Sequence, residues 1–401
     1  MATSKREAFD ALKTHFVDGP SHAAKAAVRT AAHAVFSRAR AEFDDVEKEE
    51  LLEACAALGL AGGAGSKRDA FALLEAAFVR RAHCVAKLAH KNAGNVTALA
   101  FVEGAGLVSG GDHSTCVWAE GADRGLSSDW APGGATEIAP LPGGRFATAS
   151  YATHAVEVWD AGAGRRLHDL RGHTEHALCV AALPGGLLAS GSDDKTVRIW
   201  NAGTGAHVAT LEGHEKGVNA LAALPDGRLA SGGDTVHGGI IRLWNVAARA
   251  CTQMLRPVSE VHALAALDGG RLASGCANNG IHIWSLASGI REALLSLEGQ
   301  RSFCLAALPN GLLASGGGNT VHVWDVAARA CVAVLAGHEG GDRGNVLALA
   351  ALPDGRLASG SYYDRLVRVW ALAAPGSPED AAAAAAAAGC ATVAAAPGGG
   401  P

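Results

Sequence analysis

Apolar and polar positions alternate with two different periods along the chain. Over residues 4–82 the apolar residues recur three or four positions apart, as in Phe9, Leu12 and Phe16. Residues at this spacing lie on one face of a helix. From residue 83 onward the apolar runs are short, and clusters such as Leu-Pro-Asp-Gly separate them. Such short runs between turn residues are typical of strands, so we expect helices over 4–82 and strands over 83–372.

The strand-like part of the chain repeats itself. Residues 213–245 read GHEKGVNALAALPDGRLASGGDTVHGGIIRLWN, which is a Gly-His pair followed by three strand-like runs, the last ending in Leu-Trp-Asn. Residues 172–201 and 337–370 have the same form. The tryptophan that ends each unit recurs at intervals of 40 to 46 residues, at Trp118, Trp159, Trp200, Trp244, Trp284, Trp324 and Trp370. A repeat of this length indicates that each unit is one supersecondary element and that neighbouring units share a core.

Seven such units, with a fourth strand-like run between successive units, resemble the WD-repeat β-propeller family. The resemblance covers residues 83–372 and implies an all-β, seven-bladed propeller. The last unit stops after its third strand, at Trp370, whereas the run 83–88 resembles the outer-strand run 330–335. We therefore expect residues 83–88 to form the outer strand of the last blade, which would leave no open sheet edge at the seam.

The resemblance also implies a buried hydrogen-bonded tetrad of His, Ser or Thr, Asp and Trp in the better-matching blades. A buried indole N–H and a buried imidazole each need partners, which is the physical reason for the motif. The implied tetrads are His173, Ser190, Asp194 and Trp200 in the third blade, His214, Ser231, Asp234 and Trp244 in the fourth, and His338, Ser359, Asp364 and Trp370 in the seventh.

The other blades follow this pattern less closely. The first blade has Ser109, Asp112 and Trp118, with His90 as its expected histidine. The remaining three depart from the pattern at Thr153 in the second blade, at Pro257-Val258 and Asn278 in the fifth, and at Gln300 and Gly318 in the sixth.

Two segments flank the repeats. Residues 1–82 predict a small helical domain of four amphipathic helices, and the Ala-, Gly- and Pro-rich residues 373–401 predict a disordered tail. The last two predicted helices resemble the SAP-type helix-loop-helix of DNA-binding scaffold proteins at Gly59-Leu60, Gly65 and Lys67, although Ala70 replaces an expected leucine. An ordinary capped helical hairpin fits the same residues.

Composition narrows the class of protein. The 401 residues carry a formal net charge of -5, which argues against a generally basic nucleic-acid binder. The 9 cysteines form no Cys-x-x-Cys pair, and the N-terminus has no apolar core of a signal peptide. No apolar stretch is long enough to span a membrane. We expect a soluble protein of a reducing compartment, cytoplasmic or nuclear, without a membrane partner.

The sequence contains no pattern that indicates catalysis. The 17 histidines include no His-x-x-x-His spacing, and the glycine-rich stretches lie between strand-like runs and lack the lysine of a phosphate loop. We therefore expect no enzyme activity, no metal, no cofactor and no small-molecule substrate.

What remains is a surface that binds other molecules. In the propeller family the loops that carry the histidines and the turns that carry the aspartates emerge on one face, the top face. Aromatic and arginine side chains are the strongest anchors at protein interfaces. The residues of this kind at top-face positions are Trp130, Tyr151, Arg301, Phe303, Arg343, Tyr362 and Tyr363, which include all 3 tyrosines of the chain. The insertion DTVHGG of the fourth unit is expected on the same face.

These features predict a non-enzymatic scaffold or adaptor that binds a peptide or a protein domain on the top face. One alternative is a ubiquitin-pathway adaptor or ubiquitin-binding propeller. No F-box-like segment precedes the repeats, and Trp159-Asp160 and Trp324-Asp325 lack the arginine two residues later that marks many cullin-adaptor receptors. The other alternative is nucleic-acid association through the helical hairpin that carries Lys67 and Arg68.

Overall fold

The computed structural model describes residues 82–89, 94–112, 114–118, 134–277, 280–296, 301–339 and 345–372. The predicted helical domain and the predicted C-terminal tail lie outside these residues. The described part consists of strands, turns and two short 3₁₀ segments, η2 (Pro184–Gly186) and η3 (Pro309–Gly311). The predicted all-β architecture is confirmed.

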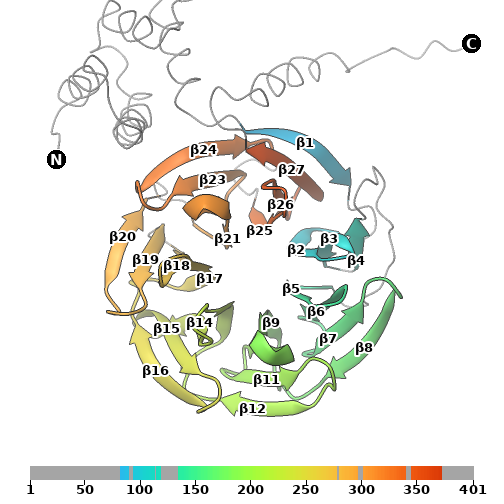
Figure 1. Ribbon diagram of the computed structural model, residues 1–401, viewed down its shortest axis with the longest axis vertical. Coiled ribbons are helices and arrows are strands. Elements are labelled where there is room, and N and C mark those ends of the chain that lie inside the picture. The colour runs from blue at the N-terminus through green and yellow to red at the C-terminus, as the bar shows by residue number, and fades with distance from the viewer. Residues whose placement is uncertain are drawn as a thin grey trace, which may run out of the picture. The chain divides into compact units, whose positions relative to one another are not determined.

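The strands form seven antiparallel sheets, which are the blades of a propeller (Figure 1). The first blade contains β2 (Val96–Val102), β3 (Gly106–Gly111) and β4 (Thr115–Trp118), and the second contains β5 (Glu137–Leu141), β6 (Arg145–Ala149), β7 (Val156–Asp160) and β8 (Arg165–Leu170). The third contains β9 (Ala177–Leu183), β10 (Leu187–Ser192), β11 (Val197–Asn201) and β12 (His207–Leu211), and the fourth β13 (Val218–Ala223), β14 (Leu229–Thr235), β15 (Gly238–Asn245) and β16 (Ala250–Leu255). The fifth contains β17 (Val261–Leu267), β18 (Arg271–Cys276), β19 (Ile281–Ser285) and β20 (Arg291–Leu295). The sixth contains β21 (Cys304–Ala307), β22 (Leu312–Gly317), β23 (Thr320–Asp325) and β24 (Ala330–Ala336). The seventh contains β25 (Val346–Ala351), β26 (Leu357–Ser361), β27 (Leu366–Leu372) and β1 (Ala82–Ala89).

The first strand of each three-strand run is the inner strand of its blade. Each inner strand contacts the inner strand of the next blade, and β25 of the seventh blade contacts β2 of the first. The seven sheets therefore form a closed ring (Figure 1).

The outer strand of the seventh blade comes from the beginning of the repeat region. β1 lies beside β27 at the outer edge of the sheet. Ala86 and Leu88 of β1 pack against a core cluster that contains Trp118, Val367 and Val369, from the first and seventh blades. A strand from one end of the repeat region thus covers the sheet from the other end.

Deleting residues 83–90 should lower the melting temperature markedly. The deletion uncovers the edge of β27 and removes the packing of Ala86 and Leu88, a loss of at least about 2 kcal/mol of unfolding free energy. Thermal unfolding followed by circular dichroism measures the effect. An unchanged melting curve would mean that β1 contributes nothing to the stability of the seventh blade.

Neighbouring blades meet at glycines of the second strands. A Cβ atom on Gly191 of β10 would lie 2.7 Å from Cγ1 of Val218 in the next blade, closer than real Cβ atoms approach. Gly232 meets Val261 and Gly316 meets Val346 in the same way, and Gly360 of the seventh blade meets Val96 of the first. These glycines are required because a valine of the next inner strand occupies the space where a side chain would be.

Candidate functional site

The antiparallel order of the strands brings two sets of connections to one end of every blade. The segment that leads into the inner strand emerges there, and so does the turn between the second and third strands. We call this end the top face. Its described segments are 94–95, 134–136, 171–176, 212–217, 256–260, 301–303, 337–339 and 345, and its described turns are 112, 114, 150–155, 193–196, 236–237, 277, 280, 318–319 and 362–365.

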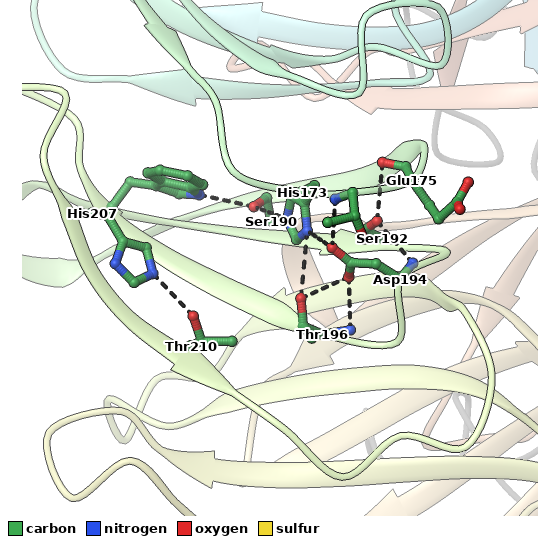
Figure 2. A network of polar contacts seen from close by, with 10 residues as sticks. His173, Glu175, Ser190, Ser192, Asp194, Thr196, His207 and Thr210 are labelled. Carbon is green, nitrogen blue, oxygen red and sulfur yellow. Dashed lines mark hydrogen bonds and ion pairs between the residues drawn. The ribbon is translucent and has the colours of Figure 1, made fainter.

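A hydrogen-bonded chain fixes the top-face segment of the third blade (Figure 2). His173 Nδ1 lies 2.7 Å from an Asp194 carboxylate oxygen, and His173 Nε2 lies 2.8 Å from Ser190 Oγ. The indole N–H of Trp200 donates to the same Ser190 Oγ at 2.9 Å. Asp194 also accepts from the backbone N–H groups of Thr174 and Thr196 at 3.1 and 3.0 Å. The segment before β9 and the turn after β10 are thereby joined.

The protonation states of this chain follow from its geometry. Burial lowers the pKa of His173, although Asp194 opposes the shift, so the imidazole is neutral at pH 7. Burial disfavours the Asp194 carboxylate, but hydrogen bonds from Thr196 and His173 outweigh it and hold the pKa of Asp194 below its ordinary value. His173 Nδ1 therefore donates to the carboxylate and Nε2 accepts from the Ser190 hydroxyl. From Trp200 through Ser190 and His173 to Asp194, each hydrogen-bond donor therefore faces an acceptor.

The seventh blade has the same arrangement. His338 Nδ1 lies 2.8 Å from Asp364 and His338 Nε2 lies 2.7 Å from Ser359 Oγ, which also accepts from the indole N–H of Trp370 at 2.7 Å. Arg368 adds a contact of 3.4 Å to the Asp364 carboxylate. The top-face segment that begins at His338 is thus tied to the turn between β26 and β27.

The fourth blade differs from the predicted tetrad. His214 Nε2 lies 2.6 Å from Ser231 Oγ, and Trp244 donates to that oxygen at 2.7 Å. His214 Nδ1 and Asp234 Oδ1 are buried and have no hydrogen-bond partner among the described residues, so the predicted bond between His214 and Asp234 is wrong. Asp234 lies within the extended ladder of β14 and β15, opposite Gly239. Burial raises the pKa of its carboxyl group, and the backbone of Val261 in the fifth blade opposes this shift.

The hydrogen bond between the tryptophan and the serine or threonine is also present in blades that follow the tetrad pattern less closely. The indole N–H of Trp284 in the fifth blade donates to Ser274 Oγ at 2.9 Å, and that of Trp159 in the second donates to Thr148 Oγ1 at 3.2 Å. In the first blade Trp118 donates to Ser109 at 2.7 Å. The expected His90 of the first blade lies outside the described residues, and so do Asn278 and Gln300, the departures from the pattern in the fifth and sixth blades. The tryptophan half of the motif satisfies the buried indole, whereas the His–Asp half joins the top-face segment to the turn; in the first blade Asn95 makes that connection by donating to the Asp112 carboxylate at 2.6 Å.

Tyr151 places an exposed aromatic ring on the top face. Its side chain is 54% exposed, and its ring stacks on His176 of the next blade with 3.6 Å between centroids and 11° between planes. His176 Nδ1 donates to the Tyr151 carbonyl oxygen at 2.6 Å, and His154 meets His176 edge-on at 4.6 Å. Contacts from two blades thus hold the exposed tyrosine ring in place.

The other predicted anchors are distributed around the same face. Tyr363 is 47% exposed and meets the half-buried Tyr362 edge-on at 5.1 Å. Arg301 is exposed, and the half-buried Phe303 packs against His262 with 5.4 Å between ring centroids. Trp130 and Arg343 lie outside the described residues.

The sequence prediction missed two exposed valines and a histidine on this face. Val236, at the tip of the β14–β15 hairpin, is 72% exposed, and Val258, in the segment before β17, is 66% exposed. The DTVHGG insertion pointed to the hairpin but not to the apolar character of its tip. His262 is the extra residue of a β-bulge in β17, a position shared with Thr97 and Asn219, and only the strand register shows it.

Two negative observations apply to the described part of the chain. No group of three or more His, Cys, Asp or Glu side chains there is arranged to hold a metal ion. None of its helical segments is long and apolar enough to cross a membrane.

The fold and the tetrads define the class: the chain forms a seven-bladed β-propeller. Three segments, residues 164–201, 205–245 and 329–371, match the family model described as WD domain, G-beta repeat. The chain therefore carries WD40 repeats. Each matched segment contains the outer strand of one blade followed by the first three strands of the next. One sequence repeat therefore does not coincide with one blade, and for the same reason β1, from the start of the repeat region, is the outer strand of the seventh blade. A comparison with curated proteins gave no match. Propellers built from these repeats generally act as protein-interaction scaffolds.

Proposed function

We propose that this protein is a non-enzymatic scaffold that binds a protein segment on the top face of its propeller. The observation that carries the proposal is the pair of exposed tyrosines, Tyr151 and Tyr363, each held against an aromatic neighbour at a turn of that face. A preorganised aromatic side chain loses little conformational entropy on binding and buries a large area. These two rings do not belong to the hydrophobic core of the blades, which consists of the third-strand tryptophans and the aliphatic side chains of the inner strands.

The tetrads support the same proposal. Two of them tie a top-face segment to the neighbouring turn, so the third and seventh blades present fixed loops. A rigid face binds without a large ordering cost.

Replacing both Tyr151 and Tyr363 with alanine should abolish partner binding with little loss of stability. Truncation of an interface tyrosine that anchors a partner costs about 2 kcal/mol or more of binding free energy, whereas exposed substitutions change stability by about 0.5 kcal/mol or less. Quantitative affinity capture from cell extract, with the intact protein and the double variant side by side, measures binding, and thermal melts measure stability.

The matched control is Val208→Ala, an exposed position on the outer strand β12. It should retain every partner that the intact protein captures. Equal capture by the double variant and the intact protein would overturn the proposal, and a large drop in melting temperature would show that the tyrosines belong to the fold.

A further inference from the structure

The outer strand of the sixth blade, β24, contains only apolar residues, in the order Ala-Cys-Val-Ala-Val-Leu-Ala. Ala333 and Leu335 are buried, so the alternation of side chains along a strand places Val332 and Val334 on the outward face. Val334 is 54% exposed, and Val332 is half-buried. We call these two valines on the outward face of β24 the β24 strip.

Every other outer strand that the structure describes has a polar side chain at one of the two equivalent positions. These positions lie one and three residues before the leucine near the end of each outer strand, as Val334 and Val332 precede Leu335. The polar residues found there are Asp169 in β8, Thr210 in β12, Thr252 in β16, Glu292 in β20 and Lys87 in β1. Polar and charged side chains protect the edge of a sheet from other segments, and the β24 strip lacks this protection.

The chain itself supplies a segment beside this strip. Residues 69–81 lie outside the described residues and lead directly into Ala82, the first residue of β1. β1 is the outer strand of the seventh blade, and the seventh blade neighbours the sixth blade, which carries β24 (Figure 1). A segment tethered this closely is present at a high effective concentration, which favours it over a second molecule as the occupant of the strip.

The sequence of the tethered segment suits an apolar strip. Phe71, Leu74 and Phe78 recur at the spacing that places side chains on one face of a helix. A helix over residues 69–80 would be about 18 Å long. The 7 residues of β24 span about 23 Å, so such a helix can lie along the strand. An isolated helix of this length is marginal in water and gains most of its stability by packing its apolar face.

We propose that residues 69–80 form a helix that packs Phe71, Leu74 and Phe78 on the β24 strip. The region before the repeats is then anchored to the outer wall of the propeller, and the top face stays open to partners. This inference does not depend on the proposed function, because β24 contributes no segment or turn to the top face.

Hydrogen–deuterium exchange of the full-length protein, read on peptides from residues 66–81, tests the docking. The amides of residues 69–80 should exchange slowly in the intact protein. Val334→Glu should raise their exchange rate at least about tenfold, because a charge replaces the apolar contact that holds the helix. Met254→Glu is the matched control and should leave this exchange unchanged, since Met254 is 50% exposed and occupies the position of Val334 on β16 of the fourth blade.

A second variant tests the same contact from the side of the helix. Phe78→Glu should raise the exchange of the remaining amides of residues 69–80 to the same extent as Val334→Glu. The exchange of the inner strands should stay unchanged in both variants, which separates loss of docking from loss of the fold.

The remaining outcomes overturn the docking or identify another occupant. Fast exchange of residues 69–80 in the intact protein would overturn it, and so would slow exchange that survives both Val334→Glu and Phe78→Glu. Protection that is lost on dilution would identify the segment of a second copy as the occupant and overturn the intramolecular contact. Replacing Tyr151 and Tyr363 with alanine should leave the protection unchanged, and Val334→Glu should leave partner capture by the top face unchanged. The docking and the proposed function can therefore fail independently.

Discussion

Replacing Asp194 with alanine should destabilise the propeller by about 2–4 kcal/mol. The carboxylate accepts from the ring of His173 and from the backbone and side chain of Thr196. Its loss leaves the buried His173 N–H with only the Thr196 hydroxyl, 3.5 Å from Nδ1. Weakening the pairing of a buried donor in this way costs up to about 1–3 kcal/mol beyond the lost hydrogen bonds themselves. Urea denaturation of the intact protein and the variant measures the difference.

The neighbouring residue provides a matched control. Asp193 lies in the same turn, carries the same charge and is exposed, so Asp193→Ala should change stability by about 0.5 kcal/mol or less. Asn319→Ala, at the exposed turn of the sixth blade, should be similarly mild. Equal melting temperatures for Asp194→Ala and Asn319→Ala would contradict the importance assigned to the third-blade hydrogen-bonded chain.

The spacing of the tryptophans was sufficient to predict the number of blades, because each indole must be buried and must find a hydroxyl partner. Trp200 and Trp370 meet Ser190 and Ser359, which lie ten and eleven residues earlier. These contacts join strands that are adjacent both in sequence and in one sheet. Local turns and strand lengths therefore determine them, and a repeat pattern is enough to locate them.

The error at Asp234 has a local cause. Asp194 follows Ser190 by four residues and Asp364 follows Ser359 by five, but Asp234 follows Ser231 by only three. In addition, the insertion after Asp234 lets β14 and β15 remain paired beyond it, so the residue lies in a strand and contacts the next blade. A match of residue type alone does not reveal in which direction the side chain points.

The top face was harder to predict because its contacts join different blades. The stacking of Tyr151 on His176 joins a turn of the second blade to a segment of the third. The close approach of Gly238 to Val258 joins the fourth blade to the fifth. Such contacts depend on the distance and rotation between sheets, and neither is encoded in a single repeat unit.

The second large change in stability is expected where the ring closes, at the junction of the seventh and first blades. Gly360→Ala should destabilise the protein by about 1–3 kcal/mol, because its Cβ would collide with Cγ1 of Val96, a fully buried and stiff β-branched side chain. Val96→Ala alone should also destabilise, by about 1–3 kcal/mol, because it leaves a cavity on the same site.

Combining the two substitutions tests whether they act on one contact. The methyl group added at Gly360 would occupy the space vacated by Val96, so the double variant should be more stable than the sum of the two single effects predicts, by about 0.5–2 kcal/mol. Urea denaturation of all four proteins completes the double-mutant cycle. Gly232→Ala with Val261→Ala is the matched cycle within the ring, between the fourth and fifth blades, because a Cβ atom on Gly232 would lie 2.5 Å from Cγ1 of Val261, and it should show coupling of the same sign. Strict additivity at Gly360 and Val96, alongside coupling at Gly232 and Val261, would mean that the first and seventh blades are not packed against each other in solution, since two side chains that compete for one space cannot act independently.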